Sequence, residues 1–200
     1  MEFGKIVGKT STNSFDFEIS SGANKFEYIQ VKHSEGYYVL CQIIEIEKDV
    51  NRAIAKCNVL GYRNSSNALC GLRTPLEPGA VVEYASDDFV QKMLGLDENT
   101  KGAYIGVLDG REKIKVFLDI NKLITKHMSV FAKSGSGKTY CVSVLLEEIL
   151  EKNIPIVVID PHGEYSSLKY PNNKLQGFEK FDVKGKGYIR NIQEFSPDIE

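Results

Sequence analysis

This 200-residue sequence lacks three features that would assign it to a particular class of protein. It contains no run of the roughly 18 apolar residues that a membrane-spanning helix needs, and its N-terminus, MEFGKIVGKT, has no signal-peptide core. Its cysteines, Cys41, Cys57, Cys70 and Cys141, include no closely spaced pair, which argues against a zinc site. We therefore expect a cytoplasmic protein with no membrane anchor and with reduced thiols.

Net charge is also nearly absent. The sequence has 25 lysines and arginines against 27 aspartates and glutamates, for a formal net charge of −2. Its hydrophobic content of 42% is enough to build a core, as in an ordinary globular protein. The whole chain thus lacks the basic excess typical of nucleic-acid binding, although such a surface can be local.

The first 120 residues are expected to form a small β-barrel or sandwich. In FDFEIS the residues Phe15, Phe17 and Ile19 share one face, and RAIAKCNV alternates in the same way. Turn clusters rich in Ser, Gly, Asn and Pro separate such runs at regular spacing. A short helix is expected over 88–94, and Asp109-Gly110 predicts a tight hairpin between AYIGVL and KIKVFLDI.

The pattern changes near residues 118–125. SVFA predicts a short buried strand, SGSGK a glycine-rich turn, and TYCVSVLLEEILEKN a helix with one apolar face. IPIVVID is a continuous apolar run, as expected of a parallel strand buried on both faces. The predicted βαβ unit divides the chain into a β-barrel over 1–120 and the first part of a phosphate-loop α/β domain over 121–200.

The stretch FAKSGSGKTY fits a phosphate-binding loop in which Ala132 replaces the usual first glycine. The expected cradle consists of Ser134, Gly135, Ser136 and Gly137. Its backbone N–H groups, with the N-terminus of the next helix, can surround a phosphate. Lys138 is expected to reach the β- and γ-phosphates of ATP, and the Thr139 hydroxyl to bind Mg²⁺. Tyr140 packs either near the nucleotide or in the core.

Polar residues follow the IPIVVI run. Asp160 ends it, as the aspartate that orders the Mg²⁺ shell ends a Walker B strand, although Pro161 rather than an acid comes next. With His162 and Glu164 it would lie at a strand C-terminus, where ligands of open α/β sheets bind. We take Lys138, Asp160 and Glu164 as candidate catalytic residues, and Thr139 and Asp160 as candidate metal ligands. In the alternative, Asp160 and Glu164 merely cap the following turn.

A basic pair, Lys126-His127, precedes the predicted loop strand. It is either a solvated pair or a contact to the nucleotide's base or ribose, or to the phosphate of a neighbouring subunit.

Several motifs together resemble the N-terminal part of HerA-type ATPases, in the HerA/FtsK group of DNA-pumping motors. They are FGKIVG, TPLEPGAVVEYAS, YIGVLDG, LDINKLITKHMSVFAKSGSGKTY and VVIDPHGEY. The resemblance implies a small β-barrel of the type found in rotary ATP synthases, followed by a RecA-like ATPase domain. Gly135 to Tyr140 match the nucleotide loop, Lys126 a basic nucleotide contact, and Asp160 and Glu164 the acids of DPHGEY. In RecA-like ATPases a water-activating glutamate follows the loop lysine at a distance similar to that of Glu164.

The resemblance also implies an assembly and a reaction. It implies a homo-hexamer that moves double-stranded DNA with ATP and Mg²⁺, acting with a NurA-type nuclease in DNA-end processing or with another effector in defence. No hydrophobic strand ending in Asp-Glu follows residue 165, so we expect a fragment of a longer motor or a truncated reading frame. A nucleotide-binding or partner-docking module without hydrolysis and a conjugation- or secretion-type ATPase remain alternatives.

Overall fold

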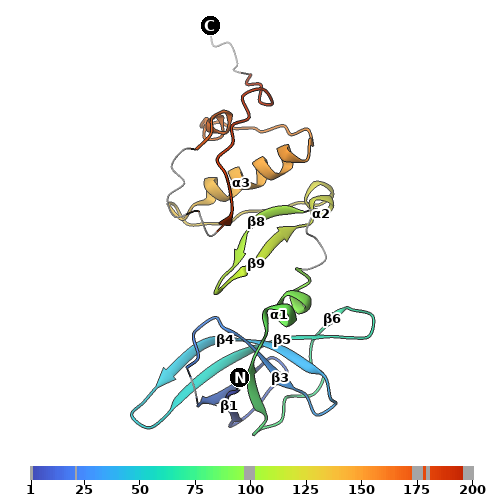
Figure 1. The fold of residues 1–200 in the computed structure, drawn as a ribbon, viewed down its shortest axis with the longest axis vertical. Helices are drawn as coiled ribbons and strands as arrows, with labels where there is room; N and C mark the ends of the chain where they lie inside the picture. Colours follow the sequence, from blue (N-terminus) through green and yellow to red (C-terminus); the bar gives the residue numbers. More distant parts are fainter. Residues whose placement is uncertain (1, 21, 97–101, 173–177, 179–180, 196–200) are drawn as a thin grey trace. The chain divides into compact units, whose positions relative to one another are not determined.

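The computed structural model describes residues 2–20, 22–96, 102–172, 178 and 181–195, and the chain divides into two compact units (Figure 1). The first unit comprises Met1–Glu98 and Asp109–Ile114, and the second comprises Asn99–Leu108 and Lys115–Glu200. Among the described residues, no helix is both long enough and apolar enough to cross a membrane.

The first unit is built on a closed antiparallel barrel, which confirms the expected β-domain. Six strands neighbour one another in the order β2-β1-β7-β3-β4-β5, and pairing of β2 with β5 closes the ring. Their bounds are β1 (Glu2–Val7), β2 (Ser14–Ile19), β3 (Tyr28–Lys32), β4 (Tyr38–Lys48), β5 (Ala53–Arg63) and β7 (Val81–Tyr84). The two-residue strand β6 (Leu69–Cys70) pairs with β5.

The predicted alternation explains how the barrel closes. Phe15 lies opposite Cys57, and Phe17 opposite Ala55, in the antiparallel pairing of β2 with β5. All four side chains are buried in one apolar cluster. Burying a phenylalanine side chain contributes roughly 1.5–3 kcal/mol, so these cross-strand pairs favour this register over one shifted by a residue.

A short helix and a buried arginine complete the first unit. Helix α1 (Asp87–Leu94) begins after Ser86, whose hydroxyl accepts the N–H of Phe89, and ends at Gly95 with φ 68°. This confirms the helix expected at 88–94.

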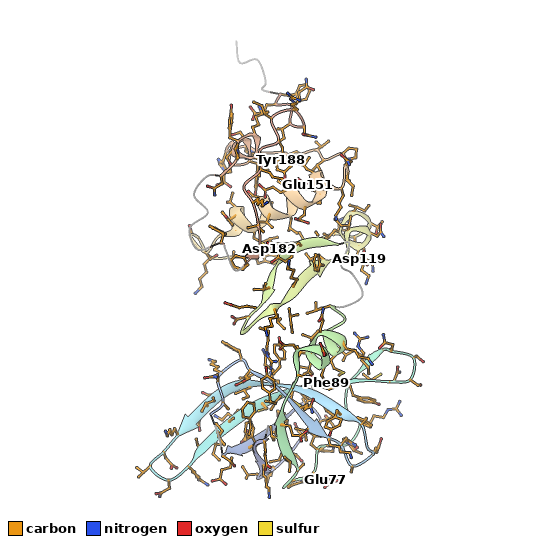
Figure 2. The ribbon with its side chains drawn as sticks, in the orientation of Figure 1. Glu77, Phe89, Asp119, Glu151, Asp182 and Tyr188 are labelled. Atoms are coloured by element: carbon orange, nitrogen blue, oxygen red, sulfur yellow. The ribbon has the colours of Figure 1, made fainter. Side chains whose placement is uncertain are left out.

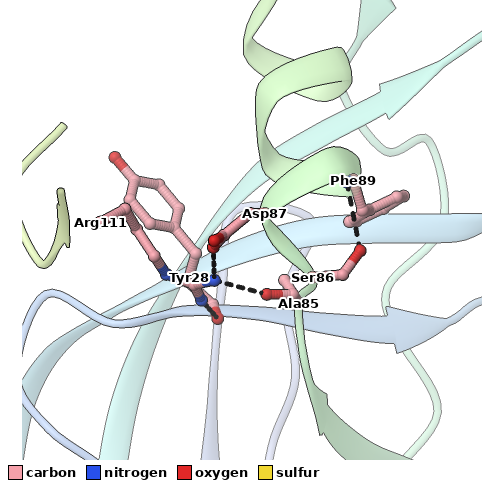
Figure 3. A network of polar contacts seen from close by, with 6 residues as sticks. All are labelled: Tyr28, Ala85, Ser86, Asp87, Phe89 and Arg111. Atoms are coloured by element: carbon pink, nitrogen blue, oxygen red, sulfur yellow. Dashed lines mark hydrogen bonds and ion pairs between the residues drawn. The ribbon is translucent and has the colours of Figure 1, made fainter. Parts of the chain in front are cut away.

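Arg111 is the first residue of β9 (Arg111–Leu118) and is only 7% exposed. Its guanidinium donates to the carbonyl oxygens of Ala85 (2.9 Å) and Tyr28 (3.2 Å) and to the Asp87 carboxylate (2.6 Å), as Figure 3 shows. It also lies 4.2 Å from the centre of the Tyr84 ring. No motif in the sequence pointed to this residue.

The described residues of the second unit include one whole strand, the second half of β9 and two α-helices. Strand β8 (Ala103–Leu108) pairs with β9 across the turn at Asp109-Gly110, as predicted. Helix α2 (Ile120–Thr125) is followed by α3 (Lys138–Glu151), which packs on β8, and by the short 3-10 helix η1 (Ser166–Lys169). The segment 181–195 returns to α3, where the Tyr188 hydroxyl donates to Glu151 at 2.7 Å (Figure 2).

The two parallel strands predicted on either side of α3 are wrong. Neither 129–132 nor 154–160 is a strand, and within the described part of the chain no other segment pairs with either. Their apolar side chains are largely in solvent: Phe131 is 92% exposed, Val157 92% and Ile159 90%. A parallel strand requires neighbours at its edges and helices over its faces, and here the described residues supply neither. The helix of the predicted βαβ unit forms, but its sheet does not.

Candidate functional site

The stretch before α3 has the backbone of an anion-binding loop. Residues 134–135 form a turn and residues 136–137 a bend, with φ of 77° at Gly135 and 90° at Gly137. These left-handed values favour glycine at both positions. The N–H and hydroxyl of Ser136 both donate to the carbonyl oxygen of Lys133, at 3.2 and 2.6 Å, which closes the turn. The curvature therefore comes from local bonds and needs no flanking strand.

The N-terminus of α3 has unused hydrogen-bond donors. Gly137 is the N-cap, no side chain caps the helix, and its first turn has no acidic residue. The N–H of Cys141 is the first to bond within the helix, to Gly137 O at 2.9 Å. The N–H groups of residues 138–140 have no acceptor among the described residues, nor does the Lys138 ammonium have an ion-pair partner there. The positive end of the helix dipole and a free cation thus meet at one point, which suits a phosphate.

Two of the predicted site residues meet directly. The Thr139 hydroxyl donates to Glu164 Oε2 at 2.9 Å, across 25 positions of sequence. Thr139 lies in the first turn of α3, one residue after Lys138. The candidate metal ligand and the candidate base therefore lie on the same side of the loop.

Asp160 has a different place. Its carboxylate accepts the N–H of Tyr165 at 2.9 Å, and Gly163, with φ 68°, lets the chain turn back. The pKa of Asp160 is lowered from its ordinary value, chiefly by the N–H of Tyr165 and further by those of Glu164, His162 and Gly163. Asp160 thus stabilises the turn that carries Glu164. This is the capping role that the sequence left as an alternative for Asp160. His162 is an exposed residue of this turn.

Lys126 and His127 line a hollow of about 290 Å³ beside α2. The residues around it are Leu118, Asp119, Lys122, Leu123, Lys126, His127 and Met128. Among the described residues, no hydrogen bond or ion pair joins the side chain of Lys126 to residues 134–139, and its backbone N–H bonds to the carbonyl oxygen of Lys122 at 3.1 Å.

Tyr140 lies at the edge of the loop. Its side chain is 53% exposed, so it is not a core residue, and its ring stacks on Phe178 at a centroid distance of 6.1 Å. Phe178 was not predicted as a neighbour of the loop, because nothing in the sequence links the two.

Comparisons with known proteins agree with these motifs. Residues 103–198 match the family model described as the central domain of the helicase HerA. The chain is 35% identical to a probable DNA double-strand break repair helicase HerA of Methanocaldococcus jannaschii, in an alignment that covers 82% of the chain and 32% of the relative. It is 29% identical to the DNA double-strand break repair helicase HerA of Pyrococcus furiosus, over 98% of the chain and 39% of the relative. A probable helicase of M. jannaschii is 36% identical, over 86% of the chain and 38% of that protein. The chain thus spans about a third to two fifths of the length of these relatives.

Proposed function

Because residues 103–198 belong to the HerA central-domain family, which makes this chain a relative of the HerA-type ATPases, we propose that its loop binds Mg-ATP. The observation that carries the proposal is the combination of Gly135 and Gly137 at positive φ with the unpaired N-terminus of α3. Lys138 and Thr139 follow that combination directly. Lys138 would neutralise the β- and γ-phosphates, and backbone N–H groups would hold their oxygens.

The residues at the loop fit a magnesium ion. Mg²⁺ in nucleotide sites takes one or two protein ligands and otherwise phosphates and water. Accordingly, a dense protein cage is not required, and no group of three or more His, Cys, Asp or Glu side chains able to hold a metal occurs among the described residues. The Thr139 hydroxyl would be the ligand from this chain. When bound, the metal would neutralise charge that develops on the transferred phosphoryl group.

We further propose that the full protein is an ATP-dependent translocase or helicase for double-stranded DNA, assembled as a cytoplasmic homo-hexamer. The support is the similarity to the relatives described above, of which one is a DNA double-strand break repair helicase and another a probable one. A nuclease of the NurA type, or another effector, would dock on the barrel during DNA-end processing or defence. In this scheme Glu164 would either activate the attacking water or orient the groups around the metal.

A second function has one observation in its favour. Residues 129–132 and 154–160 do not form the sheet that would hold the loop against further catalytic groups, and the described residues contain no Asp-Glu strand end. A nucleotide-binding module without hydrolysis of its own fits these facts.

The test compares ATP binding and hydrolysis by the chain and two variants. Lys138→Ala is expected to weaken binding roughly 10–100-fold, because a hydrogen bond to a charged group contributes about 1.5–3 kcal/mol. Lys113→Ala removes another exposed lysine, on β9, and is expected to leave binding unchanged. Equal affinity in all three proteins would refute the loop as the nucleotide site. Binding without turnover would favour the second function.

A further inference from the structure

We propose that the turn 160–165 places Glu164 on the side of the loop where Mg²⁺ binds, and that Glu164 orients the Thr139 hydroxyl toward the metal. In this proposal Asp160 positions Glu164 and is not a metal ligand. The inference rests on the proposed function, because it assigns roles within the same nucleotide site. It assigns different roles to two carboxylates whose predicted roles overlap.

The Thr139–Glu164 hydrogen bond is the first step. A threonine hydroxyl has one O–H donor and two acceptor lone pairs. Thr139 donates its proton to Glu164 Oε2 at 2.9 Å, so both lone pairs of its oxygen are left for a cation. A carboxylate in this position fixes the rotation of the hydroxyl and increases the electron density on its oxygen. Outer partners of this kind typically change metal affinity by about 10–100-fold.

The placement of Glu164 is the second step. Glu164 is an exposed residue without an ion-pair partner among the described residues, so no other charge holds its side chain in place. Its backbone is fixed instead by the turn, in which the Asp160 carboxylate accepts the N–H of Tyr165 and Gly163 takes a left-handed φ of 68°. The hydroxyl of Ser166 adds a bond to the carbonyl oxygen of Gly163 at 3.0 Å.

The engagement of Asp160 is the third step. A carboxylate binds a cation well when its oxygens face that cation, and the N–H of Tyr165 already holds Oδ2 of this carboxylate from within its own turn. A cation on Oδ2 would compete with the bond that closes the turn carrying Glu164. The observed bond therefore favours a positioning role for Asp160.

The experiment measures how Mg²⁺ changes binding of a fluorescent ATP analogue to the 200-residue chain. Affinity is recorded in EDTA and across a magnesium titration, which gives a magnesium midpoint that does not depend on turnover. Glu164→Ala is expected to raise that midpoint about 10-fold or more without weakening binding in EDTA. Glu112→Gln, an exposed acid on β9, is the matched control and is expected to change neither value. An unchanged midpoint in Glu164→Ala would overturn the role of Glu164.

Asp160 is tested by a double-mutant cycle. Asp160→Ala is expected to raise the magnesium midpoint, with partial rescue in Asp160→Asn, which keeps one acceptor oxygen. The double variant Asp160→Ala/Glu164→Ala is expected to match Glu164→Ala alone, because Asp160 acts through Glu164. Additive shifts would overturn the positioning role and make Asp160 an independent ligand.

Thr139 provides the internal check. Thr139→Val is expected to abolish the effect of Mg²⁺ on analogue binding, and adding Glu164→Ala to it is expected to cause no further change. Thr139→Ser is expected to retain both the effect of Mg²⁺ and the shift of the magnesium midpoint that Glu164→Ala causes. A Glu164→Ala shift that persists in the Thr139→Val background would contradict the inference while leaving nucleotide binding intact. Absence of analogue binding to the wild-type chain, in EDTA and in Mg²⁺ alike, would instead refute the proposed function and the inference with it. Far-UV circular dichroism of every variant excludes unfolding as the cause of a shift.

Discussion

Replacing Arg111 tests how a buried cation stabilises the first unit. Removing one partner of a buried pair costs about 3–5 kcal/mol when the remaining charge stays buried. The partner here, Asp87, has a side chain that is 37% exposed and can be hydrated, which reduces the cost. The carbonyl oxygen of the fully buried Ala85 would lose a donor, at about 1–3 kcal/mol. We therefore expect Arg111→Ala to lower the free energy of unfolding by about 2–4 kcal/mol.

The assay is urea unfolding followed by far-UV circular dichroism. Arg111→Lys keeps the charge but not the forked donors, so about half of the loss is expected. Asp87→Ala should cost less than Arg111→Ala, because it leaves a cation that still has two carbonyl acceptors. Lys113→Ala, on the same strand but exposed, controls for nonspecific effects. If Arg111→Ala and Lys113→Ala unfolded at the same urea concentration, the buried network of Figure 3 would contribute nothing and the reasoning would be refuted.

Three further predictions concern the core, the thiols and the turn. Phe17→Ala should destabilise the barrel by about 3–5 kcal/mol in urea unfolding, since the side chain is fully buried; a loss below 1 kcal/mol would contradict the packing described. Burial raises the pKa of the Cys41 thiol, so a thiol reagent should modify exposed Cys141 in the native state and Cys41 only after unfolding; equal rates would disprove the burial. In a pH titration followed by NMR, the amide of Tyr165 should shift with a midpoint below 3.8, the ordinary pKa of the Asp160 carboxyl. Because folding lowers that pKa, the stability it contributes is present above the ordinary value and is lost as pH falls through the folded pKa; a midpoint above 3.8 would exclude the capping bond.

Features that depend on neighbouring residues in the chain could be predicted from the sequence. Alternation in FDFEIS identified Phe15 and Phe17 as core residues, and Asp109-Gly110 located a hairpin, because strand faces and tight turns are fixed by local geometry. The glycine-rich turn and the helix after it are local in the same sense. The closing of β2 on β5 joins segments far apart in sequence, and no local pattern specified that pairing.

The features that were predicted wrongly or not at all depend on residues remote in sequence. IPIVVID has the composition of a buried parallel strand, but a strand exists only where another segment completes its ladder, and the described residues provide none. Arg111 could not be predicted because its partners lie on β3, just before α1 and at the first residue of α1, remote in sequence. For Glu164, the family resemblance supplied a candidate role but not the contact with Thr139, which depends on the turn at Gly163.

The contrast between local and long-range contacts also distinguishes the proposed nucleotide binding from hydrolysis in the second unit. The donors that would hold a phosphate come from residues 134–140, and their geometry is set by bonds within the loop and the first turn of α3. The contact between Thr139 and Glu164 adds only the turn 160–165, again closed by its own residues. Hydrolysis needs more, because the attacking water, metal and phosphate must be aligned to within a fraction of an ångström by rigid surroundings. The apolar segments on either side of α3 are largely solvent-exposed and do not provide that rigidity. On the proposed function, a site of this construction would bind nucleotide, and efficient hydrolysis would require Phe131, Val157 and Ile159 to be packed rather than exposed.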